Sequence, residues 1–184
     1  SWFSSALDAG TGSIVNNAAI IRKPGFPNSI LPVVSVSTQL VHFLLALPIL
    51  IIFILLSHLP LTLAVLALPL VITTQFLLIL SMVYVLATVN VSFRDTKYLL
   101  GIFLMLGFYL TPIFYDPQFI PEKLVLIYNL NPMVHIIGAY RSIFLDGQLP
   151  SFTPLAIIGL ISSFVLLLGY RYFKVASFKF VEEI

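Results

Sequence analysis

Long stretches without a charged residue are the feature that most constrains this chain. The first runs from Pro24 to Phe93, the second from Tyr98 to Tyr115 and the third from Gly147 to Tyr170. A helix needs about 20 predominantly apolar residues to cross the hydrocarbon core of a bilayer. Charged residues make up 9% of the chain, against about 25% in soluble globular domains. The sequence therefore predicts an integral membrane protein.

Helices are favoured over strands because the apolar runs do not alternate with polar residues. A barrel strand needs only about 10 residues of in–out alternation, and a helix in lipid satisfies its own backbone hydrogen bonds. We predict an all-α, polytopic transmembrane bundle that forms one domain over residues 1–184. Four complete spans are expected at Leu31–Ser57, Leu61–Val89, Tyr98–Tyr115 and Phe152–Phe173. Ser1–Leu7 resembles the end of another span, so we expect the chain to be N-terminally incomplete.

The basic residues predict an orientation, because cytoplasmic loops carry an excess of Lys and Arg. If the side holding residues 14–28 is cytoplasmic, most of the basic residues lie there and two lie outside. The expected cytoplasmic set is Arg22, Lys23, Arg94, Lys97, Arg171, Lys174 and Lys179, and the external pair is Lys123 and Arg141. The sequence thus predicts a multi-pass protein of the bacterial cytoplasmic membrane.

Residues 116–151 are too apolar for a solvated loop. Asn131 and Pro132 form a good helix start, with Asn as the N-cap and Pro at the first helical position. Asp146 and Gly147 should end that helix. Its expected packing face is Met133, Ile136, Ile137, Tyr140 and Phe144. Two helices of about a dozen residues cannot cross the bilayer, so we predict an external re-entrant hairpin.

Three stretches together resemble a known family. They are Asn16–Pro32, then Phe93-Arg94-Asp95 with the segment Phe108–Tyr115, and then Asn131-Pro132-Met133 with Tyr140-Arg141, Gly147 and Pro150. In order and spacing the chain resembles the ABC-2 type permeases that export O-antigen, capsular polysaccharide and teichoic acid. The resemblance implies six spans per subunit, a homodimer and two ATPase subunits that bind ATP and magnesium.

The resemblance also implies a coupling segment at residues 14–28 that contacts the ATPase. Its candidate docking residues are Asn16, Ile20, Arg22, Lys23 and Phe26. The competing interpretation is an ordinary cytoplasmic loop whose basic residues only set topology. Pro24-Gly25 and Asn28 depart from the family pattern, which usually has an apolar pair and an Arg at these places.

Two further groups of residues are candidates with an open alternative. Phe93, Arg94 and Asp95 could form a cytoplasmic gate, or a local Arg–Asp pair could cap the next helix. Tyr109, Tyr115, Tyr140 and Arg141 could line the substrate path and its exit. Alternatively, the tyrosines belong to the interfacial aromatic belt, and Arg141 pairs with Asp116, Glu122 or Asp146.

The residues needed for other functions are scarce. The chain has no Cys and no G-x-x-x-x-G-K-[ST] loop, so we expect ATP to bind elsewhere. No metal-ligand cluster or carboxylate pair is visible, and we expect no cofactor, no catalysis and no nucleic acid partner. A membrane enzyme acting on lipid-linked sugar and an ABC-2 drug exporter remain alternatives. A secondary transporter that uses His42 is another, although a neutral His42 bonded between helices is favoured.

Overall fold

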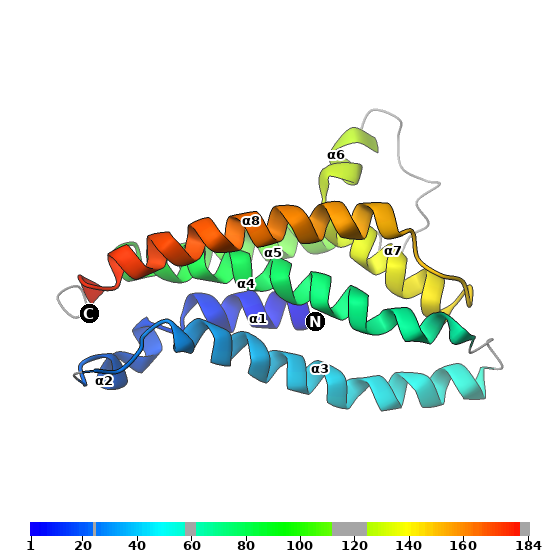
Figure 1. Ribbon diagram of the computed structural model, residues 1–184, viewed down its shortest axis with the longest axis horizontal. Helices are drawn as coiled ribbons and strands as arrows, with labels where there is room; N and C mark the ends of the chain where they lie inside the picture. The colour runs from blue at the N-terminus through cyan, green and yellow to red at the C-terminus, as the bar shows by residue number, and fades with distance from the viewer. Residues whose placement is uncertain (24, 58–61, 112–124, 181–184) are drawn as a thin grey trace.

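The computed structural model describes residues 1–23, 25–57, 62–111 and 125–180, and over these ranges the chain is a bundle of helices (Figure 1). In chain order the helices are α1 (Trp2–Thr11), the 3-10 turn η1 (Val15–Asn17), α2 (Ala18–Ile21), α3 (Ile30–Leu56), the 3-10 turn η2 (Leu63–Ala67), α4 (Leu68–Ser92), α5 (Thr96–Leu110), α6 (Val125–Leu130), α7 (Pro132–Phe144) and α8 (Phe152–Ala176). The all-α fold predicted from the sequence is confirmed.

Three of the described helical segments are long and apolar enough to cross a membrane. They are Ile30–Leu56, Leu63–Ser92 and Phe152–Ala176, with mean hydropathies of 2.7, 2.4 and 2.2. The expected span Tyr98–Tyr115 corresponds to α5, which begins at Thr96 and ends at Leu110. Its 15 residues cover about 22 Å, less than the roughly 30 Å of hydrocarbon. Residues 112–124, including Tyr115, lie outside the described residues.

The central element is α4, which packs along α8 on one side and against α1 and α3 on the other. Half of the residues in its most apolar stretch are buried inside the protein, whereas only 6% of the residues in the corresponding stretch of α3 are buried. Helix α3 therefore leaves a broad apolar surface, including Leu45, Phe53 and Leu56, for lipid or another subunit. Gly169 of α8 allows close contact with α4, since a Cβ there would lie 3.1 Å from Val85 Cγ2.

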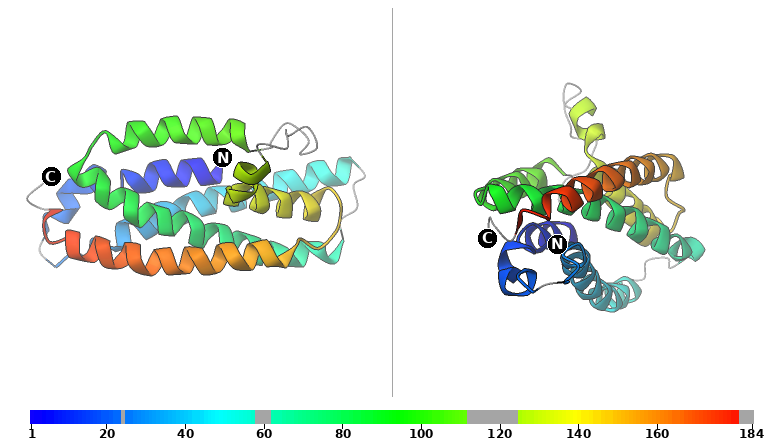
Figure 2. Two further views of the ribbon diagram at one scale, coloured as in Figure 1. Left: turned by 90° about the horizontal axis from the view of Figure 1, so that it is seen from above. Right: turned by 60° about the vertical axis from the view of Figure 1, so that its left-hand side comes forward.

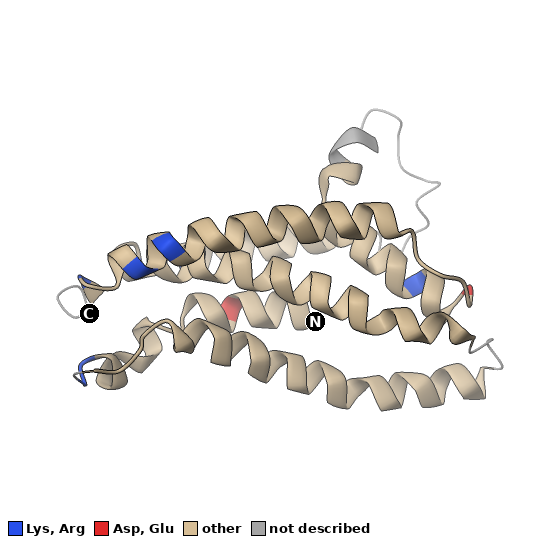
Figure 3. Cartoon of the chain, viewed as in Figure 1, with Lys and Arg blue, Asp and Glu red and all other residues tan. Residues whose placement is uncertain are grey.

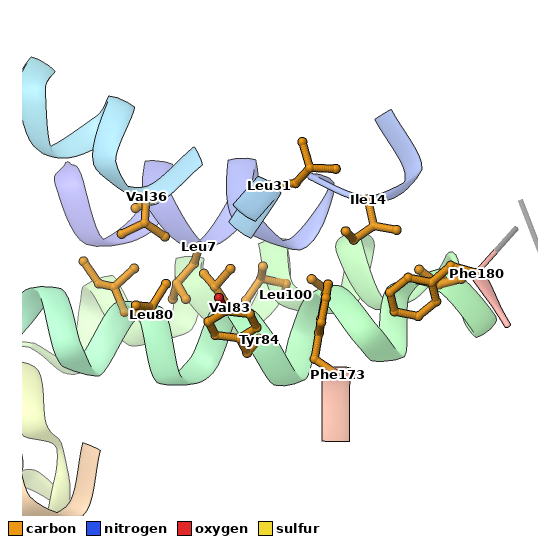
Figure 4. Packing of buried hydrophobic residues seen from close by; sticks show 14 of the residues in the cluster. Leu7, Ile14, Leu31, Val36, Leu80, Val83, Tyr84, Leu100, Phe173 and Phe180 are labelled. Atoms are coloured by element: carbon orange, nitrogen blue, oxygen red, sulfur yellow. The ribbon is translucent and has the colours of Figure 1, made fainter. Parts of the chain in front are cut away.

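One hydrophobic core lies in the half of the bundle that holds both α2 and the end of α8 (Figure 4). Leu7 of α1, Val83 and Tyr84 of α4 and Phe173 of α8 are all buried there. The Tyr84 ring makes edge contacts with Tyr170 and Phe173, at centroid distances of 5.5 and 5.3 Å. Its hydroxyl donates to the carbonyl oxygen of Ser29 at 2.9 Å, which fixes the start of α3 against α4.

A second core occupies the other half of the bundle, where α7 packs against α4, η2 and α8. Figure 2 shows that α1 and α7 lie in opposite halves of the molecule, each covering part of α4. Of the predicted face, Ile136 and Phe144 are buried, and Met133 and Tyr140 pack around them. Ile137 is half-buried and instead lines a pocket with residues of α1 and α5. Ala139 and Ile143 are buried in the same core.

The predicted start of α7 is confirmed in atomic detail. The Asn131 side chain accepts a hydrogen bond from the Met133 amide at 3.0 Å, and Pro132 occupies the first turn. The helix ends at Phe144, just before Asp146-Gly147. The other half of the predicted hairpin contains α6, a helix of six residues that projects away from the bundle in Figure 1. Entry of these two helices into the outer leaflet stays a prediction.

The basic side chains gather mainly at the end of the bundle that holds α2 and the C-terminus (Figure 3). Arg22 and Lys23 line a pocket there together with Lys174, and Arg94 and Lys97 lie beside Asn16 and Asp8. Arg141 is on α7 in the other half of the molecule. Lys123 lies outside the described residues.

Candidate functional site

The predicted coupling segment folds as a series of tight turns. The 3-10 turn η1 passes into α2, a helix of only four residues, so little of the segment at residues 14–28 is helical. Ile14 and Ile21 are buried and anchor the segment to the bundle, while Asn17 Nδ2 donates to the Ser13 carbonyl at 2.8 Å. The early end of α2 agrees with Pro24 a few residues later, because a helix usually stops before proline.

The five candidate docking residues divide into two places. Arg22, Lys23 and Phe26 line a cavity of about 530 Å³ with Phe173, Lys174 and Phe178 from the end of α8. Asn16 is exposed and lines a different hollow, between α1 and α5. Ile20 is half-buried. Sequence reasoning missed the contribution of α8, although the basic pair Arg171 and Lys174 lies on the predicted cytoplasmic side.

The candidate gate Phe93-Arg94-Asp95 is the turn between α4 and α5. All three side chains are exposed, and Phe93 is 70% exposed. The turn is held by Thr96, whose hydroxyl donates to the Phe93 carbonyl oxygen at 2.6 Å. Asp95 occupies the N-cap position of α5, but its side chain makes no capping hydrogen bond.

The structure pairs different charges from those expected at this turn. Among the described residues Arg94 has no ion pair, so the local Arg–Asp pair is absent. Instead, Lys97 Nζ lies 3.4 Å from Asp8 Oδ2, which connects α5 to α1. Both side chains are about half-exposed, so the pair contributes less than about 1 kcal/mol. The sequence gives no direct signal for this pairing, because the two residues lie on separate helices.

Tyr140 points into the bundle. Its hydroxyl donates to Gln75 Oε1 of α4 at 2.9 Å, and its ring packs against Phe43 of α3 and Phe144 of its own helix. Gln75 is only 5% exposed, and a buried amide of this kind suits a hydrogen bond between helices. Tyr140 therefore connects three helices.

The other candidate exit residues lie apart from Tyr140. Tyr109 is 66% exposed near the end of α5 and makes an edge contact with Phe108. Arg141 is half-buried on α7, and its carbonyl oxygen accepts the amides of Leu145 and Asp146. Tyr115 lies outside the described residues. An apolar pocket of about 260 Å³ between α1, α5 and α7 is lined by neither Tyr109 nor Tyr140.

His42 does not take the expected position between helices. It is exposed on α3 and makes no hydrogen bond within the part of the chain that the structure describes. The apolar residues around it on α3 are also largely exposed. The prediction that His42 forms a hydrogen bond between helices is therefore wrong within the described residues. The helix α3 packs against the bundle through a side that does not include His42.

The comparison with known families decides the class of protein. The ABC-2 type transporter family matches residues 8–145, a range that contains the coupling segment, the α4–α5 turn and α7. The chain belongs to this family. It is a multi-pass membrane protein of the transport permease type, as the sequence predicted.

Similar proteins extend the match of this ABC-2 type permease beyond residue 145. An O-antigen export system permease protein RfbA of Myxococcus xanthus is 31% identical over 185 aligned positions, which cover 100% of this chain and 71% of that protein. A protein of the same name from Klebsiella pneumoniae is 30% identical over 182 positions, or 98% of this chain and 70% of that one. The similarity therefore includes α8, which forms one wall of the basic cavity.

Proposed function

We propose that this chain is the membrane-spanning permease subunit of an ABC exporter for lipid-linked polysaccharide of the O-antigen type. It would move this substrate outward across the bacterial cytoplasmic membrane. The energy would come from a separate ATPase subunit that binds ATP and magnesium. The observation that carries this proposal is the similarity to O-antigen export permeases over essentially the entire chain.

The basic end of the bundle supports an ATPase partner. Arg22 and Lys23 are exposed beside Lys174, and no carboxylate of the described residues lines their cavity. A surface of this kind attracts a partner with acidic residues and accelerates its association. Phe26 and Phe178 add apolar surface to the cavity, and aromatic residues are common at the centre of protein interfaces. In this proposal the coupling segment and α8 form one docking site, with Asn16 at its margin.

The remaining candidate residues receive roles along the substrate path. Phe93, Arg94 and Asp95 form an exposed turn next to the docking site, where movement of the ATPase could be transmitted to α5. Tyr109 is 66% exposed, and its aromatic ring would stack on a sugar of the chain. Arg141 could contact a phosphate or sugar near the exit. Tyr140 would act by holding α7 in place, since its hydroxyl is bonded to Gln75.

A second copy of the permease is the partner proposed within the membrane. Helix α5 leaves a large apolar surface exposed along its length, including Phe103, Met105 and Tyr109. Symmetric dimers are the commonest form of oligomer. A homodimer would cover part of this surface, and lipid would cover the outward surface of α3.

Deletion of the ATPase tests the proposed energy source. In cells that produce the full-length permease, surface polysaccharide should be lost when the ATPase is deleted and restored when it is supplied again. An ATPase variant without its phosphate-binding lysine should fail to restore export. Polysaccharide export that persists without the ATPase would contradict the proposal, and ATP-dependent export of a drug alone would favour the drug exporter.

Cross-linking tests the docking site in the same cells. The chain has no native Cys, so Asn16→Cys and Lys23→Cys each introduce one reactive position on an exposed residue. Both should cross-link to the ATPase. Gln148→Cys, exposed in the loop after α7, is the matched control and should not. Equal cross-linking at all three positions would contradict the docking site.

A further inference from the structure

A polar hollow between α1, η1, α4 and α5 lies beside the proposed docking site. It has a volume of about 470 Å³, within the range of about 300–1,000 Å³ found for small-molecule sites. Its polar lining consists of Asp8, Asn16, Asn90, Arg94, Lys97 and Tyr98. No other described pocket combines cations, a carboxylate and amides in this way.

The cations of the hollow suit a phosphate group. Arg94 lies in the turn just before α5 and Lys97 lies in the first turn of this helix, and both line the hollow. Arg94 has no ion pair among the described residues, so its five donors are available. The Lys97 Nζ to Asp8 Oδ2 distance of 3.4 Å is too long for a strong charge-assisted hydrogen bond. An anion could therefore bind between the two cations.

The acceptors of the hollow suit hydroxyl groups. Asn90 is 4% exposed, and its Nδ2 is used in a 3.2 Å hydrogen bond to the Thr11 carbonyl oxygen. Its Oδ1 is buried and has no hydrogen-bond partner. A buried acceptor without a partner is destabilising, so a ligand that donates a hydrogen bond to this atom would be favoured. A fully ionised phosphate has no proton to donate, and the Asp8 carboxylate would repel the anion.

We propose that the hollow binds a glycosyl phosphate, the junction between sugar and phosphate in a lipid-linked saccharide. Arg94 and Lys97 hold the phosphate, while Asn90 Oδ1 and Asp8 accept hydrogen bonds from hydroxyls of the adjoining sugar. One ligand then satisfies both the cations and the acceptors. The inference rests on the proposed function and adds which part of the substrate is recognised at the basic end of the bundle.

Gly101 of α5 lines the hollow, so a larger side chain at this position can be used to block the site. A Cβ at this position would meet no atom within 4 Å, so a larger side chain can enter the hollow without displacing its walls. Replacement of glycine within a helix also removes a conformational cost of folding. Gly101→Leu should therefore fold well and obstruct the site. Gly159 of α8 is equally open and lies outside this hollow, so Gly159→Leu is the matched control.

The first experiment measures binding to the purified full-length permease with its ATPase in nanodiscs of neutral lipid. Glucose 1-phosphate, inorganic phosphate and methyl glucoside are titrated separately by calorimetry. Glucose 1-phosphate should bind at least about tenfold more tightly than either of the other two, because only it engages both halves of the site. Equal binding of phosphate and glucose 1-phosphate would overturn the sugar half of the proposal. No binding of any probe would overturn all of it.

The variants locate the binding. Arg94→Gln changes an exposed residue and should weaken glucose 1-phosphate binding at least about tenfold, through loss of a charge-assisted contact. Gly101→Leu should abolish binding, and Gly159→Leu should leave the affinity unchanged. Unchanged affinity in both Arg94→Gln and Gly101→Leu would place the site elsewhere and overturn the proposal.

A competition experiment separates the two membrane sources of phosphate. Nanodiscs that contain phosphatidylglycerol should compete weakly with glucose 1-phosphate, since the headgroup lacks a sugar ring. Strong competition would mean that the hollow binds a phospholipid headgroup, which overturns the proposal.

Export is measured in parallel in cells. If Gly101→Leu exports normally and only with the ATPase present, the glycosyl phosphate site fails while the proposed function stands.

Discussion

At the scale of single residues, Gly10 allows α1 and α4 to approach closely. A Cβ at Gly10 would lie 2.6 Å from both methyl carbons of Val83, well inside van der Waals contact. The valine cannot rotate away easily, because β-branched side chains have one strongly preferred rotamer in a helix. Gly10 lies inside α1, which continues to Thr11. The residue therefore serves close packing and does not end the helix.

Gly10→Ala should destabilise the protein despite the better helix propensity of alanine. Overpacking costs about 1–3 kcal/mol, and the propensity gain is at most about 1 kcal/mol. We expect a lower melting temperature in detergent, read from tryptophan fluorescence. In a Val83→Ala background the same change should become neutral or stabilising, because the clash is gone. Gly159→Ala, in open space, is the control and should not lower the melting temperature.

The hydrogen bond between Tyr140 and Gln75 should contribute modestly to stability. Bonds of this kind average about 0.6 kcal/mol in membrane proteins and reach about 1.7 kcal/mol. Tyr140→Phe removes the hydroxyl and keeps the ring against Phe43 and Phe144. A double-mutant cycle with Gln75→Leu in chemical unfolding should give a coupling in this range. A coupling near zero would show that the hydroxyl is not bonded to Gln75 in the membrane.

The same two residues show how far single side chains could be predicted. Gln75 is an amide within an apolar span and needs a hydrogen-bond partner, but the sequence does not identify Tyr140 as that partner. Tyr140 was placed both on the packing face of its helix and among the candidates for the substrate exit, and its ring is packed among α3, α4 and α7. The pair Asp8–Lys97 was missed because the approach of α1 to α5 is a tertiary property.

At the scale of elements, Asn131 joins two short helices. Its Oδ1 caps α7 by accepting the Met133 amide, and its Nδ2 donates to Thr111 Oγ1 at the end of α5, 3.2 Å away. Each half of the side chain thus has a separate task. The capping half was predicted from Asn131-Pro132, while the link to Thr111 required the folded arrangement.

Substitutions at these positions should separate the two tasks. Asn131→Ala loses both contacts, and loss of the cap alone costs about 1 kcal/mol. Asn131→Asp keeps the capping acceptor and loses the donor, and Thr111→Val removes only the link. Hydrogen exchange at the Met133 and Val134 amides should accelerate strongly in Asn131→Ala and little in the other two. Equal acceleration in all three would mean that the link to α5, and not the cap, stabilises the start of α7.

The boundaries of the long helices could be predicted well, and those of the short ones less well. The predicted spans agree within about three residues with α3, with α8 and with the segment formed by η2 and α4, because the length of a span is set by the bilayer. Helix α5 ends at Leu110, and Thr111 is extended before Pro112, as expected for a residue that precedes proline. The run of apolar residues continues past this point, so hydropathy alone extended the helix too far.

At the scale of the whole molecule, the arrangement of helices follows from which surfaces are buried. Composition could not show that α4 is central and α3 peripheral, because both are strongly apolar. In lipid, apolar side chains are equally satisfied inside or outside, so packing is decided by small residues and hydrogen bonds between helices. Gly10, Gly169 and the Tyr84 hydroxyl supply such contacts to α4.

The distribution of charge predicts how the whole bundle is inserted. Arg22, Lys23 and Lys174 come from distant parts of the sequence and meet in one cavity, so the folded chain concentrates positive charge at one end. Arg141 lies on α7, in the half of the bundle with the second core. If this end faced outward, several Lys and Arg residues would lie outside the cell, contrary to the positive-inside rule. We therefore expect the α2 end to face the cytoplasm.

Single-cysteine labelling measures this orientation directly, because no native Cys competes for the reagent. In intact spheroplasts a membrane-impermeant maleimide should label Gln148→Cys and not Phe178→Cys, both of which replace exposed residues. After detergent is added, both should react at similar rates, which controls for accessibility. Labelling of position 178 before permeabilisation would place the basic end outside. The ATPase could not then reach the coupling segment, so this outcome would also remove the proposed energy source.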